Sequence, residues 1–521
     1  MVNERQYART AEKFARLEKQ LYEKLFYKVG EVQNVELFET SEHLYEIPTE
    51  GYRPIASGES WGGENVLGWF RGTFTVPEEL AGKELYLKPN LNGEMMYYVN
   101  GVEMGIFANK RRSPVGGNHW CNLLCKEAVA GEELQVVLES WCGLFIRGTQ
   151  PFQQQEPWAG SFVSDFTSID VCLKDQLIFD TYFDLKVVND FLRMKKPEEF
   201  RRADVLRALE NAHDVVWYDP ACVDEATWRE GLVAVRKALA PVLAATGGEG
   251  GGRPTVGIIG HSHMDTAWLW TTTATIKKCA RTYANQLNLM DRYPEHRFVQ
   301  SSACHSEMLR RHYPALFERV AARVREGRYE PNGGVWVECD CNITSGESMV
   351  RQFLWGQRYT RHHFGYTSDC FWLPDTFGYS ASIPQIMKGC DVKYFLTTKM
   401  GWNDTTRFPY DTFYWQGMDG TRVFTHLNAM GGDEPGPVRL NDVANGIMSK
   451  SNSTRRLYAY GAGDGGGGPV FEMLEVARRM EDMAGCPKME YTTVSEFMQK
   501  LEAETVEAPV YARELYLELH R

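Results

Sequence analysis

The chain has 521 residues, of which 43% are apolar, 24% charged and 12% aromatic. This length and composition predict several domains with apolar cores, and they exclude a single small binding module and a mostly disordered chain. The formal net charge of -12 and the lack of any basic tract exclude nucleic acid as a partner.

The N-terminal segment carries many charges and no apolar core of signal-peptide length. No stretch of the sequence approaches the roughly 20 apolar residues that span a bilayer, so we expect no membrane partner. The twelve cysteines are scattered without the spacing of a disulfide scaffold, and we expect reduced thiols, Cys339 and Cys341 included. These features predict a cytoplasmic protein.

Three patterns follow one another in the N-terminal half. From Thr10 to Phe26 apolar residues recur at helical spacing. Short β-rich runs broken by turn residues between about 57 and 145 predict an antiparallel β-sandwich, whose aromatic residues we expect in the core rather than on a sugar. Helical spacing returns from Asp184 to Ala245, and the run Gly247-Gly-Glu-Gly-Gly-Gly252 is typical of a linker.

Beyond the glycines, strand and helix patterns alternate. Val256-Gly-Ile-Ile-Gly260 reads as a buried strand, Lys277 to Met290 as a helix, Phe298 to Ser301 as a strand and Glu307 to Arg325 as a helix. Alternation of this kind predicts an α/β fold with a parallel sheet or barrel and an active site at the C-terminal strand ends. The predicted divisions are an N-terminal helix in 1–35, the sandwich in 36–180, a helical connector and linker in 181–252, and an α/β barrel in 253–521.

The strongest chemical signal, Gly260-His-Ser-His-Met-Asp-Thr-Ala-Trp-Leu-Trp270, directly follows the first of these strands. An imidazole and a carboxylate two residues apart at a strand end point to the same side, so His263 and Asp265 are candidate ligands of a divalent metal. His261 can reach that side too. A hydrogen-bonded turn is the alternative for such a short pair.

Two further segments place polar side chains near strand ends. Asp375 follows a proline in Phe371-Trp-Leu-Pro-Asp-Thr-Phe-Gly-Tyr-Ser380, where it can face a ligand or instead cap the next helix. Glu338, Asp340 and Asn342 alternate on one predicted strand face, which either faces a wet pocket or is a solvent-facing edge.

A glycine-rich segment, Gly461-Ala-Gly-Asp-Gly-Gly-Gly-Gly-Pro469, lies near the C-terminus. It lacks the Gly-Lys-Ser/Thr of a phosphate-binding loop. Its glycines are instead expected to let the backbone and Asp464 approach a ligand closely.

These segments, in this order, resemble the α-mannosidases of glycoside hydrolase family 38, especially the cytosolic-type branch, and the sandwich is similar too. The resemblance implies a barrel of the seven-stranded type. It also implies a bound divalent metal, zinc or sometimes cobalt, held by His263, Asp265 and Asp375.

The resemblance further implies a retaining, exo-acting α-mannosidase that removes terminal α-mannose from free oligosaccharides or glycans. Asp375 would then also be the nucleophile. Trp268 would stack beneath the sugar, and Asp340 and Asp464 would bind the substrate. For the general acid/base, Glu518 lies where the last family strand enters the site, and Asp464 is the competing candidate.

The family's fourth metal ligand, a histidine in a later Phe-His-Asp segment, would lie beyond Arg521, and His520 is the alternative. We therefore expect the front part of a longer protein. Two other functions stay open: a metal-dependent polysaccharide deacetylase or amidohydrolase, in which Asp375 is a base or a ligand, and an inactive carbohydrate-binding fragment. The sequence leaves the oligomeric state open, a homo-oligomer included.

Overall fold

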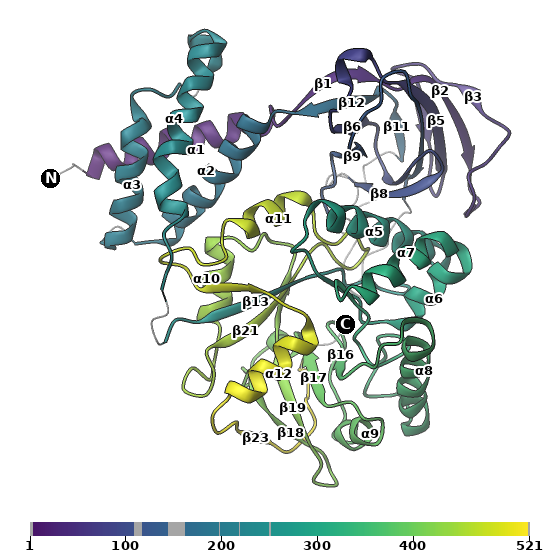
Figure 1. The fold of residues 1–521 in the computed structure, drawn as a ribbon. Coiled ribbons are helices and arrows are strands. Elements are labelled where there is room, and N and C mark those ends of the chain that lie inside the picture. The colour runs from purple at the N-terminus through teal and green to yellow at the C-terminus, as the bar shows by residue number, and fades with distance from the viewer. Residues whose placement is uncertain are drawn as a thin grey trace.

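The computed structural model describes residues 4–108, 117–143, 162–196, 198–217, 219–248 and 252–518. Within these ranges the chain forms a helical group, a β-sandwich and an α/β part, which lie side by side in Figure 1. The fold is therefore mixed α/β, as predicted.

The helical group combines the N-terminal helix with helices from much later in the chain. It consists of α1 (Glu4–Tyr22), α2 (Gln176–Met194), α3 (Phe200–His213) and α4 (Glu225–Leu243), with a 3-10 helix at Pro220–Cys222. Phe14, Leu17 and Leu21 are fully buried because helical spacing puts them on one face of α1, which packs against α2 and α3. The predicted amphipathic helix is confirmed, and Figure 1 shows it lying across the connector helices.

The sandwich consists of two antiparallel sheets. The six-stranded sheet has the order β3 (Arg53–Pro54), β2 (Gln33–Thr40), β5 (Leu67–Thr75), β10 (Glu133–Trp141), β7 (Glu94–Val99) and β8 (Val102–Ala108). The four-stranded sheet has the order β1 (Phe26–Glu31), β12 (Ser168–Lys174), β6 (Leu85–Asn90) and β9 (Asn122–Cys125). A small sheet joins β4 (Ser60–Gly62) to β11 (Val163–Asp165), and a 3-10 helix lies at Glu78–Leu80.

Apolar side chains fill both faces of the six-stranded sheet. Phe70 and Tyr97 point inward to the core between the two sheets, whereas Trp69 and Tyr98 point outward and pack against α5 and α7. The strand aromatics are therefore core residues, as predicted. The outer face of the sandwich is at the same time an interface with the α/β part.

The strands of the α/β part form two sheets. One has the order β15 (Tyr329–Glu330), β14 (Phe298–Val299), β13 (Thr255–His261), β21 (Arg455–Tyr460) and β20 (Ala429–Gly431), with β22 (Lys488–Tyr491) also paired to β13. The other has the order β16 (Cys370–Trp372), β17 (Tyr394–Thr397), β19 (Arg422–Leu427), β18 (Thr412–Gln416) and β23 (Val510–Tyr511). All pairings are parallel except that of β18 with β19.

Helices surround these two sheets (Figure 1). They are α5 (Thr272–Arg292), α6 (Ala303–His312), α7 (Pro314–Arg325), α8 (Gly346–Phe364), α9 (Ile383–Gly389), α10 (Pro437–Asn445), α11 (Phe471–Arg478) and α12 (Val494–Glu504), with a 3-10 helix η3 at Lys399–Trp402. Among the helices of the described ranges, none is both long and apolar enough to cross a membrane.

The expected closed barrel remains a prediction. No ladder of backbone hydrogen bonds joins the two sheets in the described part of the chain. They do share one apolar cluster, to which Ile259 contributes from one sheet and Trp372 and Leu396 from the other. The sheets thus enclose a common core, as the two halves of a barrel would.

Two predictions of local structure are wrong. The segment from Glu338 to Asn342 is a loop rather than a strand, because the Asp340 carboxylate accepts hydrogen bonds of 2.8 Å from the two backbone N–H groups that follow Cys341. The helix predicted over 307–325 is two helices, α6 and α7, because Pro314 has no N–H to continue the first.

Candidate active site

The candidate site begins where strand β13 ends. This strand is buried along its whole length because β21 pairs with one side of it and β14 and β22 with the other. The chain leaves the strand at His261 and carries His263, only 5% exposed, to the edge of the sheet. The imidazole is therefore held by a central strand, and little freedom is left to it.

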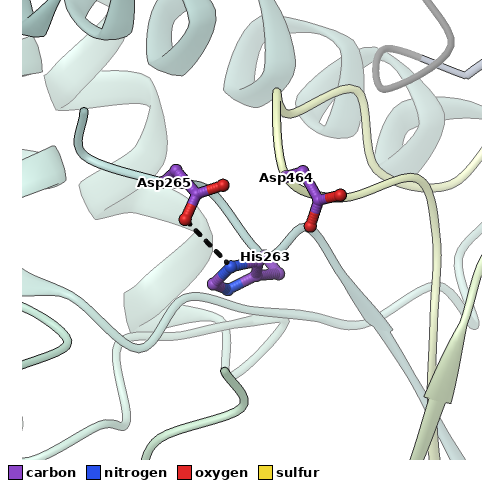
Figure 2. A group of neighbouring side chains, drawn as sticks. All are labelled: His263, Asp265 and Asp464. Carbon is purple, nitrogen blue, oxygen red and sulfur yellow. Dashed lines mark ion pairs between the residues drawn. The ribbon is translucent and has the colours of Figure 1, made fainter. Parts of the chain in front are cut away.

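The glycine-rich segment runs alongside this strand end. The backbone N–H of Asp265 donates a 2.9 Å hydrogen bond to the carbonyl of Asp464, and Met264 pairs with Gly465. At Gly461, where φ is 141°, a Cβ atom would lie 2.2 Å from the carbonyl oxygen of His261. The glycines thus let this loop pass close to the end of β13 and place Asp464 beside His263 (Figure 2). The predicted close approach to a ligand stays a prediction.

His263 lies among four carboxylates. Its Nε2 is 3.6 Å from one oxygen of Asp265 and 3.6 Å from one of Asp375. These distances exceed a hydrogen bond, and the buried Nε2 has no hydrogen-bond partner among the described atoms. Its Nδ1 lies 3.2 Å from Glu338, which orients the ring. Glu338 was predicted to lie on a strand face, but it lies in a loop and contacts the Nδ1 side of the imidazole.

The donor set fits a divalent cation. His263, Asp265 and Asp464 offer ligand atoms that all lie within 4.8 Å of one another. Figure 2 shows these three side chains. Asp375 borders the same Nε2 but turns its other oxygen to Lys399. An unpartnered buried nitrogen facing carboxylate oxygens is the arrangement that a divalent metal completes, so this is a possible metal site.

The charge balance at His263 leads to the same conclusion. Burial by itself would lower the pKa of His263, but Glu338, Asp265 and Asp375 raise it well above its usual value. The surroundings therefore stabilise a positive charge at the imidazole. A metal ion bound at Nε2 would supply that charge in place of a proton.

Asp375 is paired with a lysine that the sequence did not single out. Lys399, 2% exposed, forms an ion pair with Asp375 and lies 3.2 Å from the ring centre of Trp402 and 4.5 Å from that of Phe377. Burial alone would raise the pKa of Asp375, but His263 and Lys399 hold it below its usual value. A lone lysine directly after the β17 strand was the only sequence signal for this role.

Asp464 behaves in the opposite way. Burial raises its pKa, and the nearby carboxylates of Asp265 and Asp375 raise it further against the effect of His263. The pKa of Asp375 is therefore lowered, whereas that of Asp464 is raised. Two neighbouring carboxyl groups with pKa values pushed apart are the usual basis for separate acid and nucleophile roles.

Asp265, Asp375, Lys399 and Asp464 border a cavity of about 850 Å³. Trp268, which is 40% exposed, contributes a broad apolar face, and Asp340, Asn342 and Trp402 also line the cavity. Its size suits a small ligand, and the mixture of indole rings with carboxylates suits one that has an apolar face and several hydroxyl groups.

Glu518 lies apart from this group. Its carboxylate accepts hydrogen bonds of 2.7 Å from the backbone N–H of Thr406 and 2.8 Å from that of Thr405. Hydrogen bonds from Thr406 and Thr405 lower its pKa to about 2. Tyr516 and Leu517 line the cavity, whereas Glu518 is not among its described lining residues.

The two remaining histidine candidates do not join the group either. His261 is buried and packs on the Trp372 ring, with the ring centres 4.5 Å apart. With His263 and Asp464 it borders a second cavity of about 650 Å³, but it offers no atom to the His263, Asp265 and Asp464 ligand group. His520 lies outside the described residues.

Comparison with known proteins matches the N-terminal domain of the glycosyl hydrolases of family 38 to residues 253–514. Alpha-mannosidase G of Dictyostelium discoideum is 32% identical over 90% of this chain and 42% of its own length. Human alpha-mannosidase 2C1 is 34% identical over 93% of this chain and 45% of its own. The alpha-mannosidase of Saccharomyces cerevisiae is 41% identical over 50% of this chain and 25% of its own.

The chain thus spans less than half the length of these curated relatives. The family match begins just before β13 and includes His263, Asp265, Asp375 and Asp464. By this match the chain belongs to glycosyl hydrolase family 38.

Proposed function

We propose that this protein acts as an exo-acting α-mannosidase, which removes terminal α-mannose from free oligosaccharides or glycans with retention at the anomeric carbon. The family and the names of the relatives support this proposal. The observation that carries it is the pair Asp375 and Asp464, which border one cavity and have pKa values shifted in opposite directions.

Asp375 would be the nucleophile. The positive charges of His263 and Lys399 keep its carboxylate ionised in spite of burial. One of its oxygens would attack the anomeric carbon while the bond to the leaving oxygen breaks, giving a mannosyl ester of Asp375.

Asp464 would be the general acid/base. Its raised pKa favours the protonated form that can donate a proton to the leaving oxygen. The resulting carboxylate would then take a proton from the water that hydrolyses the ester, which restores both carboxyl groups. We prefer Asp464 to Glu518 because Glu518 is ionised, already hydrogen-bonded and outside the cavity lining.

We further propose that the metal is zinc, with cobalt as the alternative, and that His263, Asp265 and Asp375 hold it with Asp464 close by. When bound, the ion would supply positive charge that orients the hydroxyl groups of the sugar. Trp268 would then present its ring to the C–H face of the pyranose, and Asp340, which also lines the cavity, would bind its hydroxyl groups.

The two parallel sheets are proposed to be two parts of one barrel of the seven-stranded type within 253–521. Side chains link the two sheets: Asn332 accepts a 3.2 Å hydrogen bond from the N–H of Cys370, and His426 accepts one of 3.2 Å from that of Leu457. The divisions 1–35, 36–180 and 181–252 are proposed for the rest of the chain. A cytoplasmic location is also proposed, because the cysteines are scattered without the spacing of a disulfide scaffold.

The proposal is tested by trapping the ester. A fluorinated mannosyl fluoride should leave a covalent adduct on the peptide that contains Asp375, detected by mass spectrometry, because fluorine slows hydrolysis of the intermediate. The Asp375→Asn variant should carry no adduct, whereas Glu518→Gln should be labelled like the wild type. An unlabelled wild-type protein, or an adduct on another residue, would contradict the retaining mechanism.

A further inference from the structure

Two buried ion pairs join the sandwich to helix α5. Lys278 of α5 pairs with Glu94 of β7 at 2.7 Å, and Lys277 pairs with Glu139 of β10 at 2.6 Å. All four side chains are at most 4% exposed. Adjacent residues of one helix thus make matched contacts with two strands of one sheet.

Only the first pair reaches the loop that borders the active-site cavity. The ammonium of Lys278 lies 4.4 Å from the ring centre of Trp270 and 5.2 Å from that of Trp141. Trp270 is 7% exposed, and its indole N–H donates a 3.1 Å hydrogen bond to the hydroxyl of Thr275. Lys277 instead lies over the rings of Tyr45 and Trp69, which belong to a different apolar cluster from Trp141 and Trp270.

Trp270 in turn contacts Trp268. The two indole rings meet edge to face at 81°, with their centres 5.8 Å apart. The backbone N–H of Trp268 also donates a 3.2 Å hydrogen bond to the carbonyl of Trp270. A continuous series of contacts therefore runs from Glu94 in the sandwich to the half-exposed ring in the cavity.

We infer that Lys278 and Glu94 are positioning residues for Trp268, and that through them the sandwich sets the geometry of the sugar-binding surface. This inference rests on the proposed function, since Trp268 is taken as the ring that stacks on the sugar. No residue of the sandwich is among the described residues lining the 850 Å³ cavity, so the effect is indirect.

The physical basis is the high cost of moving a buried charge. Lys278 and Arg281 share the Glu94 carboxylate, so this charge is held from two positions of α5. The buried ammonium of Lys278 attracts the face of the Trp270 indole. Because this charge is costly to move, the attraction favours the ring position that the structure shows. The hydrogen bond to Thr275 holds the indole of Trp270 in place, and Trp268 makes an edge-to-face contact with it.

The test compares two matched double variants. Glu94→Gln/Lys278→Met and Glu139→Gln/Lys277→Met each remove a buried ion pair and keep side chains of similar size, and the first also removes the carboxylate that pairs with Arg281. We expect the first to raise KM for an aryl α-mannoside about tenfold with a smaller change in kcat, because a displaced ring weakens sugar stacking. The second should leave KM unchanged. The conservative variant Lys278→Arg keeps the positive charge, so its KM should stay close to that of the wild type.

Hydrogen exchange measured by mass spectrometry provides a readout that does not need activity. Deuterium uptake over residues 264–271 should rise in the Glu94→Gln/Lys278→Met variant and not in its counterpart. If the two double variants change KM or loop exchange equally, the pair has only a structural role and the inference is wrong. If one double variant does not fold, Glu94→Gln and Glu139→Gln alone provide the same comparison.

The two proposals fail in different ways. A wild-type protein that hydrolyses no α-mannoside would overturn the proposed function, while loop exchange would still decide whether Lys278 positions Trp268. An active wild type with equal effects in both double variants would overturn this inference alone.

Discussion

At the level of single residues, the site is organised by the positions of two cations. His263 and Lys399 both border Asp375, so this carboxylate stays ionised although it is buried. Asp464 lies near the same groups but forms no ion pair with Lys399 in the described structure, and burial dominates its pKa. Small differences in contact thus separate two otherwise similar carboxyl groups into different chemical roles.

The role of Asp464 is tested by chemical rescue. In Asp464→Ala, turnover of an aryl α-mannoside should fall about 10²- to 10⁴-fold, because no base then activates the water that attacks the ester. Azide needs no such base, so it should accelerate this variant and give α-mannosyl azide, identified by mass spectrometry. Glu518→Ala should show neither the loss nor the acceleration, and the reverse pattern would assign the role to Glu518.

The sequence indicated the site residues to the extent that they lie in short motifs. His263 and Asp265 follow one strand, so their shared orientation could be predicted from local geometry. Lys399 begins the 3-10 helix η3 and Glu338 lies in a loop, and only the tertiary fold brings them to Asp375 and His263. A single lysine or glutamate in a loop has no local pattern that would have indicated these contacts.

At the level of elements, long segments with strong periodicity were predictable and short ones were not. The core strand β13 and the helix α5 follow directly from apolar runs and helical spacing. Strands β14 and β15 have two residues each, so pairing with neighbours rather than sequence pattern defines them. The Glu338 loop was predicted as a strand because Asp340 forms a turn that alternating polarity does not indicate.

Helix α11 contacts the sandwich through a buried carboxyl group, that of Glu472. One oxygen of Glu472 accepts a 2.8 Å hydrogen bond from the indole of Trp120, and the other has no hydrogen-bond partner among the described atoms. Burial raises the pKa of Glu472 to about 7. The folded protein therefore holds a proton at this contact over a pH range in which the unfolded chain does not.

This shift predicts a pH-dependent stability. The favourable contribution is fully present below the usual pKa of Glu and is lost as the pH rises through about 7, because only the folded state must then bury a charge. Glu472→Gln should match the wild type near pH 4.5 and exceed it by about 3 kcal/mol at pH 8, measured by urea unfolding. A difference that does not change with pH would show that Glu472 is ionised in the folded protein.

At the level of the whole molecule, the three parts meet along faces that carry buried charges. The sandwich contacts α5 through Glu94 and Glu139, and the helical group contacts the α/β part through Asp184 of α2. The sequence predicted the parts but not these contacts, because the partners lie far apart in the chain. The order of strands in the two sheets could not be predicted from the sequence either, since local patterns do not specify which strands pair.

Asp184 is expected to hold the helical group in place. It is 7% exposed and accepts hydrogen bonds from Arg236 of α4 at 3.1 Å and from Arg479 after α11 at 2.7 Å. Asp184→Ala should lower the free energy of unfolding by about 2 kcal/mol, because the largely buried Arg479 and the more exposed Arg236 lose a shared carboxylate. Asp204→Ala, which breaks only an exposed pair with Arg207, should change it by less than about 0.5 kcal/mol. Equal effects of the two variants in urea unfolding would show that the helical group does not depend on this contact.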